Sequence, residues 1–326
     1  MDILLNVLRD TKINEEITIS GSKSESNRLL ILQNLFSEIS IENLSDSDDS
    51  IHMQHALSTK DELVDIGHAG TAMRFLTSYF AVKIGREVVL TGSERMQNRP
   101  IEILVNALKD LGADISYEAK VGYPPIRIKG KNSIKEKVQI NGNVSSQYIS
   151  SLLLIASKLK KGLEIELVGK ITSIPYINMT LSLLNQLTIE TSFEGNIIKV
   201  FPKESIQKQT VVVESDWSSA SYFYSIIASA AIGSSIKLSA YKEESLQGDS
   251  CLAEIYTHFG VVTIFGKDCI ILKKEGKTNA ETLAINLKNA PDIAQTIAVT
   301  CFSEGISCNL TGLHTLKIKE TDRLEA

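Results

Sequence analysis

The sequence predicts an α/β protein of two domains that is built from repeated units. Helix-like segments recur about every 74 residues, and β-branched runs lie between them. The chain has 326 residues, of which 43% are hydrophobic and 22% charged. That length suggests about two domains at roughly 150 residues each. The composition excludes collagen-like, fibrous and disordered proteins.

The first repeated segment is a small polar loop that leads into a Ser/Ala-rich apolar stretch. Its copies are anchored at Gly70, Ser145, Ser218 and Asp292, at steps of 75, 73 and 74 residues. Serine, threonine and aspartate are the residues that cap free N–H groups at helix starts. We therefore expect a helix after each anchor.

The second repeated segment is a strand that ends in a turn and precedes an amphipathic helix. Its turn positions are spaced by 71 to 77 residues and are Gly92, Gly169, Ala240 and Gly312. After Gly92, a helix is expected to begin near Pro100, to carry its apolar stripe from Ile101 to Leu111, and to end at Gly112.

The β-branched runs between these helices predict strands at residues 87–90, 163–167, 197–200 and 209–213. Each period then supplies two helices and several strands, a βαβαββ-like unit that needs its neighbours to bury both faces. The last copy starts at Leu310 and stops at Ala326, before a full unit is reached. This favours a chain that is a fragment.

Charge and composition also limit the function. A net charge of −5 and a pI near 5.7 argue against a nucleic-acid binder. The four cysteines form no CxxC pair, which favours a reduced, cytoplasmic protein, and the sequence shows no signal peptide or membrane span. The five histidines include no HExxH motif, so a metal site has little support.

Arginine is scarce, and five of the eight arginines fall in short distinctive segments at expected helix starts. Helix N-termini and arginine side chains both favour anions. Candidate anion-binding cations are Lys23, Arg28, Arg99, Lys319 and Arg323. Hydroxyl donors at the same helix ends are Ser22, Ser24, Thr71, Ser145, Ser146 and Ser173. This combination predicts a site for a small phosphorylated or carboxylated metabolite.

Common nucleophile and nucleotide motifs are missing, since the chain has no GxSxG, no P-loop and no GxGxxG. The candidate acid–base groups are Asp292 and Glu320, each beside a cation or a helix start. The acidic residues Asp46, Asp48 and Asp49 are expected to favour a helix N-terminus rather than to bind a metal.

Taken together, six segments resemble the 5-enolpyruvylshikimate-3-phosphate (EPSP) synthase family. They are Gly21-Ser22-Lys23-Ser24 with Asn27-Arg28, Gly67 to Arg74, Arg95 to Pro100, Ser145-Ser146-Gln147, Asp292, and Lys319-Glu320-Thr321-Asp322-Arg323. The resemblance implies transfer of the enolpyruvyl group of phosphoenolpyruvate to the 5-hydroxyl of shikimate 3-phosphate, with release of phosphate. It implies no metal and no organic cofactor, and we expect a cytoplasmic monomer of the shikimate pathway.

The resemblance also implies the enolpyruvyl transferase-like fold, an inside-out α/β barrel of two domains with three βαβαββ units each. One domain is expected over residues 13–213. The other combines residues 1–12 with 214–326 and lacks its final unit.

Site residues follow from the resemblance, position by position. Those expected to bind shikimate 3-phosphate are Lys23, Ser24, Arg28, Ser145, Ser146, Gln147, Ser173, Asp292 and Lys319. Those expected to bind phosphoenolpyruvate are Lys23, Gly70, Arg99, Gln147 and Arg323. The expected catalytic residues are Lys23, Asp292, Lys319 and Glu320. Asp292 would orient or deprotonate the attacking hydroxyl, and Glu320 would handle the proton at the methylene carbon.

Three positions depart from the family pattern: His68 replaces the usual Asn, Phe75 the usual Pro, and Thr315 an Asn. Gly70 implies room for inhibitors such as glyphosate. Two alternatives stay open. One is UDP-N-acetylglucosamine enolpyruvyl transferase, although the loop between Gly92 and Pro100 lacks the cysteine typical of that enzyme. The other is a non-catalytic anion-binding fragment.

Overall fold

The computed structural model describes residues 12–131, 135–171, 174–279, 281–318 and 322–325. It divides into two compact units: Gly21–Val213, which we call the large unit, and Met1–Ser20 with Glu214–Ala326, the small unit. The division follows residue 20 rather than residue 12, because strand β1 (Asn14–Ile17) pairs with a strand of the small unit.

Three four-stranded sheets share one topology. In each, the first two strands are parallel and the other two complete the sheet antiparallel, in the spatial order first, second, fourth, third. One such sheet of the large unit consists of β3 (Leu63–Asp65), β4 (Glu87–Thr91), β6 (Ile126–Lys129) and β5 (Asp114–Tyr117). The other consists of β7 (Lys137–Asn141), β8 (Leu163–Val168), β10 (Ile197–Val200) and β9 (Thr191–Glu194). The sheet of the small unit is β1, β12 (Ser235–Ser239), β14 (Cys269–Lys274) and β13 (Val261–Gly266). The predicted βαβαββ unit is confirmed.

Two further pairs of parallel strands form small sheets: β2 (Ile39–Glu42) with β11 (Gln209–Val212), and β15 (Thr282–Asn286) with β16 (Ser307–Thr311). The strands of the described residues thus form five separate sheets, and they do not close into a barrel. The four runs predicted as strands correspond to β4, β8, β10 and β11.

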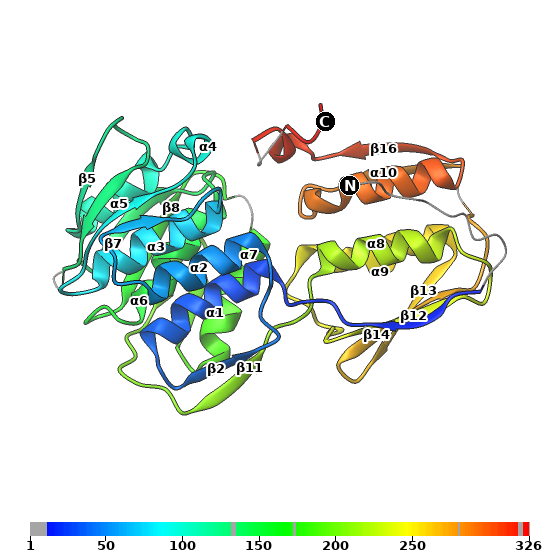
Figure 1. The fold of residues 1–326 in the computed structure, drawn as a ribbon, viewed down its shortest axis with the longest axis horizontal. Coiled ribbons are helices and arrows are strands. Elements are labelled where there is room, and N and C mark those ends of the chain that lie inside the picture. Colours follow the sequence, from blue (N-terminus) through cyan, green and yellow to red (C-terminus); the bar gives the residue numbers. More distant parts are fainter. Residues whose placement is uncertain (1–11, 132–134, 172–173, 280, 319–321, 326) are drawn as a thin grey trace. The chain divides into compact units, whose positions relative to one another are not determined.

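Helices fill the centre of the large unit (Figure 1). The described helices of this unit are α1 (Lys23–Leu35), α2 (Asp48–Ser58), α3 (Gly70–Val82), α4 (Glu94–Gln97), α5 (Glu102–Leu111), α6 (Ser146–Ala156) and α7 (Ile174–Gln186), and of these α4 lies at the edge (Figure 1). Helices α1, α3 and α6 pack against one another, and α3 and α6 are buried along nearly their whole length. Helix α5 ends at Gly112, as predicted. The φ of Gly112 is 107°, a left-handed conformation that favours glycine at a helix end.

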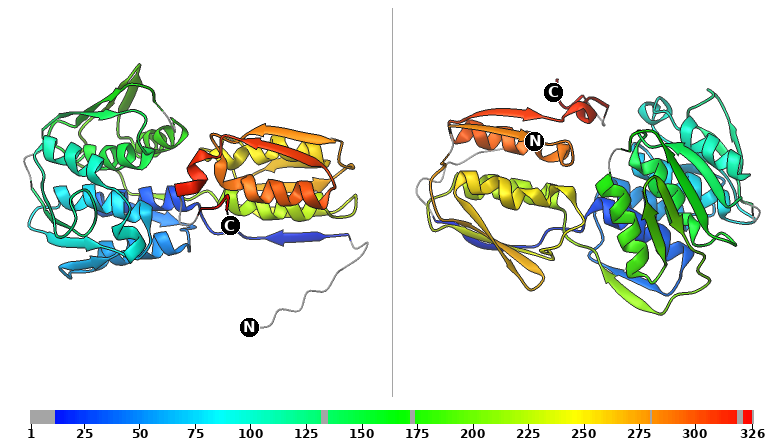
Figure 2. Two further views of the ribbon diagram at one scale, coloured as in Figure 1. Left: turned by 90° about the horizontal axis from the view of Figure 1, so that it is seen from above. Right: turned by 180° about the vertical axis from the view of Figure 1, so that it is seen from behind.

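The core of the small unit is aromatic. Helix α8 (Trp217–Ala228) places the buried Trp217 and Tyr224 against Tyr241 and Tyr256, and α9 (Leu252–Ile255) packs beside it. Helix α10 (Ala294–Ser303) lies between α8 and strand β16 (Figures 1 and 2). The apolar side chains of α8 and the strand faces bury one another and so exclude water from this core.

Hydroxyl side chains join α8 to α10. Ser221 donates a hydrogen bond to Thr296 at 2.9 Å, Thr300 donates to Ser225 at 2.8 Å, and Ser229 lies 2.9 Å from Ser303. The paired residues are 74 or 75 positions apart, which equals the repeat period. The Ser/Ala-rich stretches therefore allow two parallel helices to approach closely while their polar groups stay satisfied.

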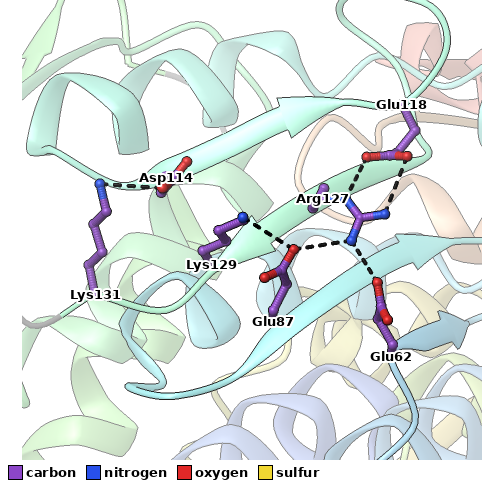
Figure 3. Close-up of polar contacts among 7 residues, drawn as sticks. All are labelled: Glu62, Glu87, Asp114, Glu118, Arg127, Lys129 and Lys131. Carbon is purple, nitrogen blue, oxygen red and sulfur yellow. Dashed lines mark hydrogen bonds and ion pairs between the residues drawn. The ribbon is translucent and has the colours of Figure 1, made fainter.

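An ion cluster covers the outer face of the β3–β4–β6–β5 sheet (Figure 3). Arg127 on β6 contacts Glu62 at 2.6 Å, Glu118 at 2.8 Å and Glu87 at 3.1 Å. These carboxylates come from three neighbouring segments of the sheet. One guanidinium with five N–H donors thus ties the strands together by their side chains.

Candidate active site

The N-terminal turn of α1 carries three of the predicted site residues. Ser22 is the N-cap, and its hydroxyl accepts from the N–H of Glu25 at 3.5 Å. Lys23 and Ser24 follow and are partly exposed. A Cβ at Gly21 would lie 1.9 Å from the carbonyl oxygen of Asn43, so only glycine allows this close approach. The turn presents the N–H groups of a helix start, a cation and a hydroxyl together.

The N-terminus of α3 meets the guanidinium of Arg99. A Cβ at Gly70 would lie 2.6 Å from Nη1 of Arg99, which shows how closely that side chain crosses the helix start. Arg74 fixes this arrangement, because it donates to the carbonyl oxygens of Gly70 at 3.2 Å and Pro100 at 3.0 Å. Tyr148 on α6 donates to the same Pro100 oxygen at 2.8 Å.

The N-terminus of α6 is bound to that of α3. Ser145 is its N-cap and accepts from the N–H of Gln147 at 3.4 Å. The side chain of Gln147 donates to the hydroxyl of Thr71 at 3.2 Å. Ser145 is exposed and Ser146 is buried. The helix starts that carry Gly70 and Gln147 are therefore neighbours, although 76 residues separate the two bonded side chains.

Arg28 is buried, with only 2% of its surface exposed. It donates four hydrogen bonds to protein atoms: to the hydroxyls of Thr180 and Ser150 and to the carbonyl oxygens of Ser24 and Tyr176. Burial lowers the pKa of Arg28 to about 10. The guanidinium is thus held by α1, α6 and α7. Thr180 and Ser150 are not among the residues predicted from the sequence. The one available signal is that Ser150 follows Ser146 by one helical turn.

The small unit carries an open pocket of about 570 Å³. Asp292 and Arg323 are among the residues that line it, and they form an ion pair. Asp292 lies in the short helix Pro291–Ile293 that precedes α10, and Arg323 Nη1 lies 2.9 Å from its Oδ1. Tyr222, Ile226 and Val299 form the apolar wall of this pocket. An acid–base candidate and a candidate anion-binding cation therefore face one another.

The acidic residues near α2 support the helix starts. Asp48 and Asp49 lie in the first turn of α2, as expected, and Asp49 accepts from the N–H of Thr71 at 3.4 Å. Within the described ranges, no group of three His, Cys, Asp or Glu side chains is arranged to hold a metal ion. His68 lies 3.6 Å from Asp48, beside the Gly70 turn.

Residues 56–326 match the family model for EPSP synthase (3-phosphoshikimate 1-carboxyvinyltransferase). Over 317 residues, the chain is 44% identical to a 3-phosphoshikimate 1-carboxyvinyltransferase of Bacteroides fragilis, a match that covers 97% of this chain and 77% of that protein. A protein of the same name from Haemophilus ducreyi is 35% identical, with 97% and 78% covered. The chain belongs to the EPSP synthase family.

Solved EPSP synthases share the fold. An EPSP synthase structure from Acinetobacter baumannii superimposes with a TM-score of 0.75 at 20% identity, over 98% of this chain and 78% of that chain. A second structure of an EPSP synthase from that organism gives a TM-score of 0.61 over 94% of this chain. The family is one of transferases of the shikimate pathway, as the sequence resemblance implies.

Within the large unit, the structure brings together most of the residues that the EPSP synthase resemblance selects there. The α3 and α6 ends join Gly70, Arg99 and Gln147, and Arg28 ties Ser24 on α1 to α6. In the small unit, Asp292 and Arg323 are paired. Ser173, Lys319 and Glu320 lie outside the described residues. None of the helices in the described part of the chain is long and apolar enough to cross a membrane.

Proposed function

We propose that this chain transfers the enolpyruvyl group of phosphoenolpyruvate to the 5-hydroxyl of shikimate 3-phosphate and releases phosphate. The observation that carries the proposal is the set of joined helix starts in the large unit, where α1, α3 and α6 present N–H groups, hydroxyls and cations. Such starts bind phosphate and carboxylate groups. Membership of the EPSP synthase family supports the choice of both substrates.

The residues proposed to bind shikimate 3-phosphate are mainly serines and cations, with one amide and one carboxylate. They are Lys23, Ser24, Arg28, Ser145, Ser146, Gln147 and Ser173 from the large unit, with Asp292 and Lys319 from the small unit. The proposed phosphoenolpyruvate ligands are Lys23, Gly70, Arg99, Gln147 and Arg323. Arginine suits this second group because its planar fork binds carboxylate or phosphate with two hydrogen bonds.

The Asp292–Arg323 pair suggests how the proposed base is held before the reaction. An incoming carboxylate would take the place of Asp292 at Arg323, which frees Asp292 to accept the proton of the 5-hydroxyl. The hydroxyl oxygen then bonds to C2 of phosphoenolpyruvate while C3 takes up a proton. Glu320 is the proposed group that transfers this proton. Loss of phosphate, with removal of a proton from C3, restores the double bond. Cations stabilise the charge of the tetrahedral intermediate.

We further propose that the reaction needs no metal and no organic cofactor, and that the protein is a cytoplasmic monomer that binds small molecules. The test measures phosphate release from both substrates together with calorimetric binding of shikimate 3-phosphate. Turnover that is lost in Glu320→Gln, with binding retained, supports the transferase. Binding without turnover would favour the anion-binding alternative, and a folded chain that neither binds nor turns over would contradict the proposal. Turnover with UDP-N-acetylglucosamine as acceptor would point to the related transferase.

A further inference from the structure

Four hydrogen bonds hold the buried guanidinium of Arg28 in the large unit. We call Arg28, its hydroxyl partners Ser150 and Thr180, and the carbonyl oxygens of Ser24 and Tyr176 the Arg28 cluster. Arg28 Nε donates to Thr180 at 2.8 Å, and Nη2 donates to Ser150 at 3.1 Å and to the Tyr176 carbonyl oxygen at 3.3 Å. Nη1 donates to the Ser24 carbonyl oxygen at 2.7 Å. Ser150 and Thr180 are fully buried. The bonds fix the guanidinium in its plane, because acceptors surround it on several sides.

The two hydroxyls also bond to each other. The Thr180 hydroxyl lies 2.9 Å from that of Ser150, and both lie within 3.5 Å of the Tyr176 carbonyl oxygen. Each hydroxyl has one hydrogen to donate. If that hydrogen goes to its neighbour or to the carbonyl, the lone pairs stay directed at the guanidinium. The cluster is thus a polarised network in which the positive charge of Arg28 orients both hydroxyls.

The cluster connects the three segments that carry the serines proposed to bind shikimate 3-phosphate. Arg28 follows Ser24 by four residues on α1, and Ser150 follows Ser146 by four on α6. Thr180 lies on α7, the helix that begins at Ile174, directly after Ser173 in the sequence. Each cluster member therefore lies one to two turns inside a helix whose start bears a proposed ligand.

We infer that Ser150 and Thr180 are positioning residues for the binding of shikimate 3-phosphate. They hold Arg28 and thereby fix the starts of α1, α6 and α7 relative to one another. The inference rests on the proposed function. The two hydroxyls are buried and act through Arg28. A binding constellation is effective only when such supporting groups hold it to within about 0.5 Å of the productive geometry.

Burial supports this role for the hydroxyls. Because Arg28 has lost its water, each N–H that loses its acceptor leaves an unsatisfied charged donor. The guanidinium would then turn toward other acceptors and carry the Ser24 carbonyl with it. The start of α1 would shift against α6, and the proposed ligands on both would lose their common geometry.

The variant that tests the inference is Thr180→Val, which keeps the shape of the side chain and removes the acceptor for Nε. We expect the Kd for shikimate 3-phosphate, measured by calorimetry, to rise about ten- to hundredfold. Thr180→Ser restores the hydroxyl and should bind within about threefold of the wild type. Ser150→Ala should also weaken binding, since it removes one of the two acceptors of Nη2 and leaves only the Tyr176 carbonyl oxygen.

Thr77→Val is the matched control. Thr77 is a fully buried threonine of α3 in the same unit, and its hydroxyl donates to the Met73 carbonyl oxygen at 2.6 Å. It should reduce the free energy of unfolding in urea without changing the Kd. An unchanged Kd in Thr180→Val and Ser150→Ala, with a wild type that binds, would overturn the inference alone. A folded wild type that does not bind would overturn the proposed function and the inference together. If Thr180→Val fails to fold, Ser150→Ala and Thr180→Ser decide.

Discussion

At the scale of single residues, two arginine side chains of the large unit pack closely against the start of helix α3. Gly70 is the clearest case, because the guanidinium of Arg99 occupies the space that a side chain would need. Arg74 holds the same turn from inside by hydrogen bonds to two carbonyl oxygens. The two arginines thus have different tasks: one is buried and supports the backbone, and the other is partly exposed at the helix start.

Gly70→Ala should therefore change ligand binding more than stability. The added methyl group lies 2.6 Å from Arg99 Nη1, and the flexible arginine can move away without disturbing the backbone. The displaced guanidinium should raise the Kd for phosphoenolpyruvate, measured with shikimate 3-phosphate present, about tenfold. Thermal unfolding should change little. Gly276→Ala, whose new Cβ would meet nothing nearer than 4.0 Å, is the control. Equal affinities in all three proteins would refute the proposed role of Arg99.

At the scale of elements, the helix pairs are held by hydroxyl groups placed one repeat apart. In the small unit these groups link α8 to α10 along their length. In the large unit, Ser78 on α3 donates to Ser151 on α6 at 2.9 Å. Small side chains allow the helices to approach, and the hydroxyls satisfy one another in the apolar interior.

Thr300→Val tests this helix pairing. The Thr300 hydroxyl is bonded to Ser225, to the Tyr256 hydroxyl and to the Thr296 carbonyl oxygen, each at 2.8 Å. Its loss leaves buried partners unsatisfied and should reduce the free energy of unfolding by about 1 to 3 kcal/mol. The fluorescence of Trp217 in urea measures this. Ser229→Ala, at the exposed end of the same ladder, should cost less than about 0.5 kcal/mol; equal losses would mean that burial is not the cause.

The ion cluster around Arg127 makes a pH-dependent contribution to the stability of the β3–β4–β6–β5 sheet (Figure 3). The hydrogen bond from Arg127 holds the pKa of Glu87 below its usual value. The lowered pKa stabilises the folded state above the usual value, and the effect is lost as falling pH protonates Glu87. Arg127→Met should thus lower the melting temperature at pH 7, and by less in acid. Lys131→Met removes a single pair, to Asp114 at 3.5 Å, and should change it less at either pH. A pH-independent difference would contradict the electrostatic explanation.

For the whole molecule, two units imply two unfolding processes. The single tryptophan, Trp217, is buried in the small unit, whereas both units contain helices. Chains with separate cores often unfold in more than one step. We expect the urea transition seen by tryptophan fluorescence to differ in midpoint from the one seen by far-ultraviolet circular dichroism. Coincident transitions at several temperatures would show that the two units unfold as one.

The α/β class, the repeat period, the helix starts and the family could all be predicted from the sequence. These properties are local, since capping residues, apolar stripes and β-branched runs are each read within a few residues. Because the family motifs are short continuous segments, the candidate ligands were also visible. The unit boundary at residue 20 was not, since it depends on the pairing of β1 with β12, 221 positions away in sequence at Asn14 and Ser235.

Only the tertiary structure decided what the candidate residues contact. The partners of Arg28 lie 122 and 152 residues away in the sequence, and the hydroxyl residues that bind it look like ordinary helix residues when read singly. The sequence alone indicated Arg28 as a candidate ligand residue, but not that packing of α1 against α6 and α7 buries it among acceptors. A linear pattern records which residue types are present. The distances between their side chains depend on how the helices pack, and packing joins segments that the pattern does not relate.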